Sequence, residues 1–321
     1  MITIHRHEGG FTRCVDRVDP AWLSPESSVW VWVDLDRPTP AEARILTDVF
    51  HFHDLAVEDA LSESHHPKIE SYGTFLYLIL HGIDFNASEH CFRTKDIDFF
   101  LGPRFLVTVH PGVSRSIGKV NELCGRNDRV LGEGPGVLLH RIIDTMVDNY
   151  RPEIAKLETR LDTLESDVFE HPDTKLARGI LEFKRDVASL RQVVMPQRDA
   201  VARLARREFP VIDEQLAYRF RDVYDHLVRL SDEAMFFQDR ITSILDAHLS
   251  AVSNQLNQVM KVLTIFTTVA MPLTVLTGLY GMNVRLPVLP GGEPAQFWWI
   301  IGMLLGISGV MLAVFRRRRW I

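Results

Sequence analysis

The hydrophobic pattern of the chain changes in about its last sixty residues. Residues 262–280 and 297–315 contain no Asp, Glu, Lys or Arg. As α-helices, stretches of this length would measure roughly 28 Å, about the thickness of a bilayer's hydrocarbon core. Buried helices of a soluble domain are the alternative, but two equal stretches followed by a run of arginines favour transmembrane helices. The sequence predicts two spans, 262–280 and 297–315, joined by an external loop, 281–296.

The flanking charges predict the orientation of these spans. Residues 1–10 are polar and His-rich, so they do not form the apolar region of a signal peptide. The arginine cluster in the basic tail, 316–321, is typical of a cytoplasmic end. We expect a multi-pass protein of the inner (plasma) membrane with both termini in the cytoplasm. Cys14, Cys91 and Cys124 are widely spaced, as expected in a reducing compartment.

The N-terminal part alternates short β-rich runs with helical ones. One helix is expected to open at Thr39-Pro40-Ala41-Glu42, with proline in the first helical position, and another to span residues 54–62. A glycine-rich break at 132–136 ends this part, so we predict an α/β cytoplasmic domain over 1–131. Four strands are expected: Val29–Val33, Phe75–Leu80, Ile97–Leu101 and Phe105–Val109.

The following region, 132–261, shows helical periodicity only. His171-Pro172 interrupts it and predicts an antiparallel hairpin. No proline occurs between Pro210 and Pro272, and apolar residues alternate at spacings of four and three. This seam is typical of a coiled coil and predicts a single helix over about 213–279, roughly 100 Å long. Such a helix must pack against others, so we expect oligomerisation. The seam reads Leu216, Phe220, Val223, Leu227, Leu230, Ala234, Phe237, Ile241 and Ile244, then Leu245, Leu249, Val252, Leu256, Val259 and Leu263.

Together these segments predict an α+β/α membrane protein: an N-terminal α/β cytoplasmic domain, a long-helix coiled-coil-like stalk or funnel and two C-terminal transmembrane helices. Residues 262–321 carry five arginines and one acid, a net charge of +4, so the remainder carries −10 of the total of −6. This acidic part argues against a nucleic-acid partner and suits attraction of cations, although it also favours solubility. We interpret the acidic segment 153–170 as a solvated helix face, with a cation-attracting surface as the alternative.

A second stripe runs beside the seam on the long helix. Its residues are uncharged and are asparagine, threonine, methionine or glycine. Such residues can serve close helix packing, with hydroxyls bonded to the backbone, or they can line an aqueous path. The end of the stripe at Tyr280-Gly281-Met282-Asn283 favours the path, because an amide oxygen can bind a hydrated magnesium ion without a charge. The stripe consists of Asn257, Met260, Thr264, Thr267, Met271, Thr274 and Gly278.

Several motifs resemble the CorA family of divalent metal ion (magnesium/cobalt) transporters. They are Tyr280–Asn283, the preceding 260–264 and 271–274, and, in the cytoplasmic part, Glu58-Asp59-Ala60-Leu61 and 221–226. The resemblance implies a homopentamer in the lipid bilayer, with five long helices around a pore. It also implies uptake of hydrated Mg²⁺, and of Co²⁺, gated by intracellular Mg²⁺, without an organic cofactor.

The resemblance also assigns roles to single residues. Asp59 and Asp222 match the family's regulatory metal pair, and Glu58, Asp225 and Glu293 are weaker candidates. Tyr280, Gly281, Met282 and Asn283 match the selectivity mouth. Pore-lining positions are Asn257, Met260, Leu263, Thr264, Thr267, Met271, Thr274 and Gly278, with Met271 and Leu263 at the constriction.

The loop after Asn283 departs from the family pattern. It places Arg285 near the mouth and its only acid at Glu293, which is closer to the loops of zinc-transporting ZntB relatives. A ZntB-like zinc transporter, proton-coupled or an exporter, is therefore an alternative, although only Tyr280 is ionisable within 262–280. A membrane-anchored scaffold is a third possibility. We interpret His51, His53, His65 and His66 as structural or surface residues. The sequence contains no phosphate loop, nucleophile elbow or zinc-protease motif, so nothing in it indicates an enzyme.

Overall fold

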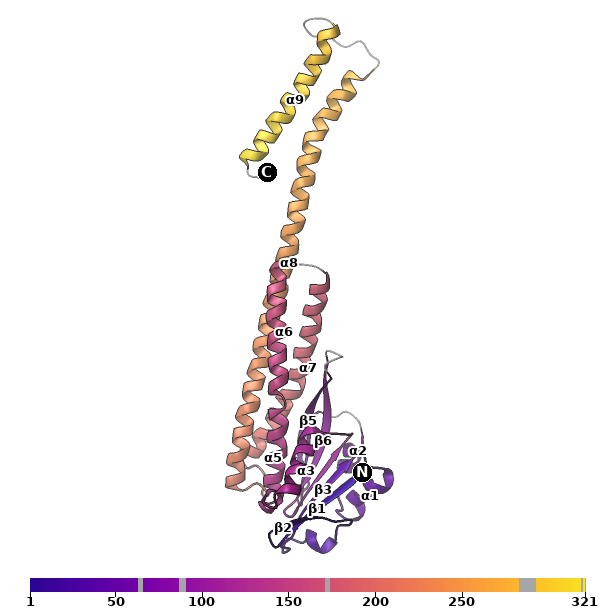
Figure 1. The fold of residues 1–321 in the computed structure, drawn as a ribbon, viewed down its shortest axis with the longest axis vertical. Helices are drawn as coiled ribbons and strands as arrows, with labels where there is room; N and C mark the ends of the chain where they lie inside the picture. Colours follow the sequence, from indigo (N-terminus) through magenta and orange to yellow (C-terminus); the bar gives the residue numbers. More distant parts are fainter. Residues whose placement is uncertain (63–65, 87–90, 171–173, 283–292, 319, 321) are drawn as a thin grey trace. The chain divides into compact units, whose positions relative to one another are not determined.

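The computed structural model describes residues 1–62, 66–86, 91–170, 174–282, 293–318 and 320. Residues Met1–Leu245 form one compact unit, and Asp246–Ile321 form a second. Figure 1 shows both units and labels most of their helices and strands. The domain bounds given above remain predictions.

A mixed sheet forms the centre of the first unit. Its strands are β1 (Ile2–Glu8), β2 (Phe11–Cys14), β3 (Trp30–Asp36), β4 (Lys68–Ser71), β5 (Leu76–Asn86), β6 (Cys91–Leu101) and β7 (Phe105–His110). They lie in the order β2-β1-β3-β7-β6-β5-β4. Strands β3 and β7 pair in parallel, and the other neighbours pair antiparallel.

All four predicted strands are confirmed as β3, β5, β6 and β7, with β5 and β6 longer than expected. Strands β1, β2 and β4 were not predicted. Strand β1 is polar by composition, yet its His5 and His7 are buried. Their ring nitrogens form hydrogen bonds with the side chains of Asn121 and Thr12. Because these buried polar groups are satisfied, the strand can be part of the sheet without an apolar pattern.

Helices cover both faces of the sheet. Figure 1 shows α1 (Pro40–Asp48) and α2 (Asp54–Leu61) on one side, and α3 (Arg115–Arg126) and α5 (Pro135–Asp148) on the other. The predicted start of the first helix is confirmed: Thr39 and Glu42 form a reciprocal capping box around Pro40. The unit also contains η1 (Pro20–Leu23) and α4 (Arg129–Gly132).

Three long helices follow. They are α6 (Arg151–Glu170), α7 (Thr174–Ala205) and α8 (Glu214–Tyr280), so the hairpin and the single long helix are both confirmed. Every seam position from Leu216 to Ile244 is buried within this one chain. Phe237 contacts Phe183 of α7, and Phe220 contacts His140 of α5. This part of the seam therefore packs intramolecularly, and it is not the surface that requires other copies.

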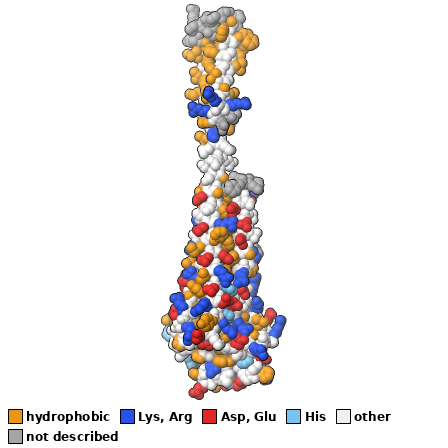
Figure 2. Space-filling view, turned by 90° about the vertical axis from the view of Figure 1, so that its left-hand side faces the viewer, with side chains coloured by type: hydrophobic (Ala, Val, Ile, Leu, Met, Phe, Trp, Pro, Cys, Tyr) orange, Lys and Arg blue, Asp and Glu red, His pale blue; other side chains and the backbone are white. Residues whose placement is uncertain are grey.

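The second unit contains the rest of α8 and α9 (Glu293–Arg317). Both helices are long and apolar enough to cross a membrane. Helix α9 begins at Glu293, four residues before the predicted span. In Figure 2, hydrophobic side chains cover these apolar segments, and Lys and Arg side chains gather where α9 ends.

Candidate cation pathway and metal-binding cluster

All the predicted pore-lining residues of α8 lie on its surface within a single chain. Met260 and Leu263 are more than half exposed, and the threonines and Gly278 are exposed as well. Most half-buried positions on the same stretch fall on a different face of the helix, and Ala270 lies at the edge of the stripe. The others are Ile265, Thr268, Val269, Pro272, Leu273 and Leu276. The stripe is therefore left uncovered by the chain's own second apolar helix.

The hydroxyl groups of the stripe bond to their own helix. Thr264 donates to the carbonyl of Met260 at 2.7 Å, and Thr274 donates to that of Ala270 at 2.9 Å. Thr267 donates to the carbonyls of Leu263 and Thr264. The donors are thus satisfied, while each hydroxyl oxygen keeps acceptor capacity toward water or an ion's hydration shell. This geometry is compatible with both interpretations of the stripe, close packing and an aqueous path.

The inner end of the stripe lies beside the C-terminal tail. Asn257, Met260 and Thr264 line a cavity of about 520 Å³ together with Lys261 and Trp320. The tail therefore returns to the level at which the apolar part of α8 begins. This places the basic end of α9 beside Lys261, as expected of an antiparallel pair of spans with both polar ends on one side.

The structure describes only part of the outer end of the stripe. Tyr280 ends α8, and Gly281 and Met282 form a turn in which Gly281 donates to the carbonyl of Thr277 at 2.9 Å. A side chain at 281 would have its Cβ only 3.0 Å from that carbonyl oxygen, so the turn favours glycine. Asn283 and Arg285 lie outside the described residues. Glu293 is the first residue of α9.

The first unit contains a cluster of candidate metal ligands around Asp222. Asp144 of α5 and His226 of α8 join it, with one ligand atom from each residue within 4.8 Å of the others. Burial, and then the neighbouring Asp148, raise the pKa of Asp144. Repulsion of this kind is relieved when a cation lies between the carboxylates.

His226 completes the cluster and constrains its chemistry. Its Nε2 lies 4.0 Å from Asp222 Oδ1 and accepts from Arg151 at 3.5 Å, and its buried Nδ1 has no partner among the described residues. Carboxylate oxygens suit Mg²⁺, whereas an imidazole also suits Co²⁺, Ni²⁺ and Zn²⁺. A cation bound at Nε2 would displace the Arg151 guanidinium.

Asp59, the other predicted regulatory residue, has a partner in its own chain. Lys68 Nζ lies 2.6 Å from its Oδ2 and also bonds Glu70 at 3.0 Å. Glu58 lies next to it on α2, and Asp225 lies on the surface of α8 outside the cluster. The predicted pairing of Asp59 with Asp222 across subunits remains a proposal.

Sequence reasoning did not single out Asp144 or His226. The i, i+4 spacing of Asp222 and His226 was a usable signal, since it places both on one helix face. Asp144 gave no such signal, because α5 and α8 meet only in the fold. Among the other histidines, His53 caps α2 and His51 bonds the carbonyl of Thr47, while His65 lies outside the described residues.

An α/β domain followed by one very long helix and a second apolar helix defines a class of membrane protein with a large polar domain and a short membrane part. The sequence matches the family described as CorA-like Mg²⁺ transporter protein over residues 27–317. The chain belongs to this family.

Relatives that match over most of both chains support the assignment to this family. The chain is 30% identical to the putative metal ion transporter YfjQ of Bacillus subtilis, covering 91% of this chain and 90% of that protein. It is 29% identical to the cobalt/magnesium transport protein CorA of Thermotoga maritima, covering 92% and 85%. The zinc transport protein ZntB of Pectobacterium atrosepticum is 25% identical, covering 90% and 88%.

A solved structure shares the fold. The CorA magnesium transporter of Methanocaldococcus jannaschii aligns with a TM-score of 0.84 at 22% identity, covering 100% of this chain and 99% of that one. The predicted fold class is therefore confirmed along the whole chain.

Proposed function

We propose that this protein is a homo-oligomeric, pentameric channel for divalent cations that takes up Mg²⁺, and also Co²⁺, across the inner membrane. Its α8 helices surround the pathway, and the threonine, methionine and asparagine stripe lines it. The observation that carries the proposal is the uncovered stripe on α8, which lies in a chain of the CorA-like family. Both termini are in the cytoplasm.

The membrane potential would supply the driving force. An inside-negative potential contributes about 2.3 kcal/mol per charge per 100 mV, and twice as much for a divalent ion. No phosphate-binding loop is present in the sequence, so uptake needs no nucleotide hydrolysis in this mechanism.

Gating by intracellular Mg²⁺ is assigned to Asp59 and to the cluster around Asp222. A bound cation offsets the repulsion among Asp144, Asp148 and Asp222, and its loss favours their separation. The imidazole of His226 extends the range of this regulatory site to Co²⁺. The gate therefore responds to the same kinds of ion that the pathway carries.

Ion flux into proteoliposomes tests the proposal. Mg²⁺, Co²⁺, Ni²⁺ and Zn²⁺ are compared at an inside-negative potential, with and without a pH gradient. We expect Mg²⁺ and Co²⁺ influx that follows the potential and ignores the pH gradient. Zinc flux that requires the pH gradient would favour the ZntB-like alternative, and no flux of any ion would favour a scaffold.

Asn283→Ala removes the amide proposed to bind the hydrated ion at the mouth. We expect uptake to fall at least about tenfold while the assembly keeps its mass, because a charge-assisted interaction is lost without a packing change. Gln255→Ala, which removes an exposed amide of α8 outside the stripe and outside the cavity at its inner end, is the matched control. Normal uptake by the Asn283 variant would exclude the mouth assignment.

A further inference from the structure

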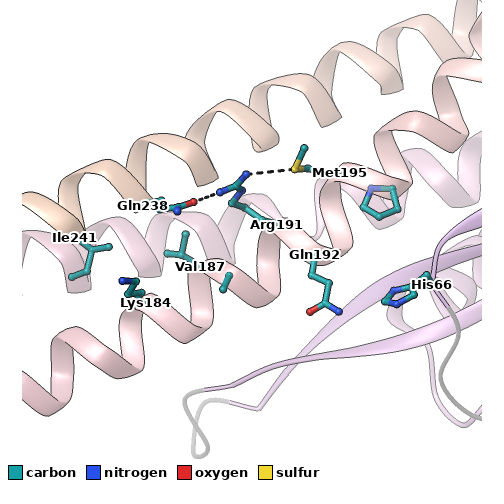
Figure 3. A pocket seen from close by; sticks show the side chains of 10 residues that line it. His66, Lys184, Val187, Arg191, Gln192, Met195, Gln238 and Ile241 are labelled. Atoms are coloured by element: carbon teal, nitrogen blue, oxygen red, sulfur yellow. Dashed lines mark hydrogen bonds between the residues drawn. The ribbon is translucent and has the colours of Figure 1, made fainter.

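A cavity of about 530 Å³ lies in the first unit between α7 and α8, beside the segment that precedes β4. Figure 3 shows Arg191 extending from α7 toward Gln238 of α8, with His66 on the side of the sheet. This volume is in the range of sites for small organic ligands, roughly 300–1,000 Å³. The cavity is separate from the stripe on α8 and from the cluster around Asp222.

One part of the wall is apolar. Val187 and Ile241 are buried, and Met195 and Pro196 continue the surface. Because Pro196 lies inside α7, it removes the helical donor to the carbonyl of Gln192, which also lines the cavity. The wall therefore offers an apolar surface together with a hydrogen-bond acceptor.

The other part is positively charged. Lys184 and Arg191 are seven residues apart on α7, which places them on one face of the helix, two turns apart. No carboxylate is among the described residues that line the cavity. The two side chains give it two permanent positive charges.

Among the residues that the structure describes, no carboxylate pairs with the Arg191 guanidinium. Its Nη1 donates to Gln238 Oε1 and its Nη2 lies 3.9 Å from Met195 Sδ, a weak acceptor, while its buried Nε has no partner among the described residues. Arg160 and Arg240, on neighbouring helices, both pair with carboxylates. Half-burial of a cation that has no carboxylate partner among the described residues is unfavourable, so the cavity favours an anion.

We propose that this cavity binds a soluble phosphomonoester that carries an aromatic group, such as a nucleoside monophosphate. A phosphomonoester has a charge of about −1.5 to −2 at pH 7, which matches Lys184 and Arg191 together, whereas one carboxylate would match only one of them. The guanidinium fork suits phosphate oxygens. The aromatic group lies against Val187, Pro196 and Ile241.

Calorimetric titration of the purified full-length protein in detergent tests this assignment without any measurement of transport. The probes are AMP, phenyl phosphate, adenosine and inorganic phosphate, each with EDTA present so that metal binding does not contribute. We expect AMP or phenyl phosphate to bind at least about tenfold tighter than inorganic phosphate, and adenosine to bind at least about tenfold weaker than AMP. If neither phosphomonoester binds more tightly than inorganic phosphate, the proposal is wrong.

Two variants of neighbouring residues locate the site. Lys184→Gln should weaken phosphomonoester binding about tenfold, because a charge-assisted contact is lost from an exposed side chain that folding does not need. Arg185→Gln removes the same charge from the next position, which does not line the cavity, and should leave binding unchanged. Equal effects of the two variants would indicate general attraction by surface charge and overturn the assignment.

Arg191→Met distinguishes two possible counter-ions of Arg191. One is a bound ligand, and the other is a carboxylate from a second copy of the chain. We expect this variant to lose phosphomonoester binding and to keep the mass of the assembly. A reduced mass, combined with no binding by the unaltered protein, would show that a carboxylate of a neighbouring copy occupies the cavity. That result would overturn the proposal.

Discussion

Asp98 is a carboxyl group buried in the sheet of the first unit. It lies on β6 and accepts a hydrogen bond of 2.6 Å from the hydroxyl of Tyr77 on β5. Burial raises the pKa of Asp98 to about 7, although the Tyr77 hydrogen bond acts in the opposite direction and Asp96 adds to the increase. The side chain is therefore protonated in the folded protein at pH values where an unfolded chain would be ionised.

This shift makes stability depend on pH. Between pH 4 and pH 7 the folded state holds one proton more than the unfolded state, so the free energy of unfolding falls as pH rises, by up to ~4 kcal/mol. Asp98→Asn keeps an acceptor for Tyr77 and removes the titration. Thermal unfolding of both full-length proteins across this pH range should show a shallower decline for the variant. Equal slopes would contradict the raised pKa.

The cluster around Asp222 makes a second prediction at the residue scale. Asp222→Asn and Asp144→Asn should each weaken Co²⁺ binding about tenfold or more, because each removes one charged ligand. Asp232→Asn, also exposed on α8, should bind as the unaltered protein does. The measurement is calorimetric titration with Co²⁺. Unchanged affinity in Asp144→Asn would remove α5 from the site.

At the scale of elements, α8 has two different parts. Its seam is buried in the chain as far as Ile244, whereas Leu249, Leu256, Val259 and Leu263 are exposed and Val252 is half-buried. The sequence marks this point, because the spacing of four and three is interrupted by a step of one residue from Ile244 to Leu245. The difference arises because α5, α6 and α7 contact α8 within the first unit, which ends at Leu245. In the proposed assembly, it is the later part that contacts other copies of the chain.

Leu227→Ala and Leu256→Ala compare the two parts with the same substitution. Leu227 is 0% exposed and Leu256 is 61% exposed. Leu227→Ala should lower the stability of the first unit by about 2–5 kcal/mol, because it leaves a cavity in a packed core. Leu256→Ala should leave that stability unchanged and weaken the assembly, as read from thermal unfolding and light scattering. An equal loss of stability would contradict the division.

For the whole molecule, the proposed assembly places the α8 stripe around a shared axis. Met271 and Phe266 are exposed to nearly the same extent in the single chain, 71% and 70%, but lie on opposite faces of α8. In a protein without its native cysteines, Met271→Cys should form disulfides between copies under oxidation. Phe266→Cys should face lipid and stay monomeric on a denaturing gel. The reverse pattern would place the stripe toward lipid and remove the pathway.

The sequence by itself determined the long helix, the hairpin before it, the two apolar helices and four of the strands. These follow from local patterns: helical or alternating periodicity, a capping residue such as Thr39, and runs of apolar residues of fixed length. The motif ending at Asn283 gave the family for the same reason, since it is contiguous.

Only the tertiary structure decided which residues meet. It paired β3 with β7 in parallel, brought Asp144 to Asp222 and His226, buried His5 and His7, and placed Arg191 beside Gln238 with no carboxylate partner among the described residues. Each of these depends on residues that are far apart in the chain. Their chemistry arises from burial and from neighbours, which a local pattern does not contain.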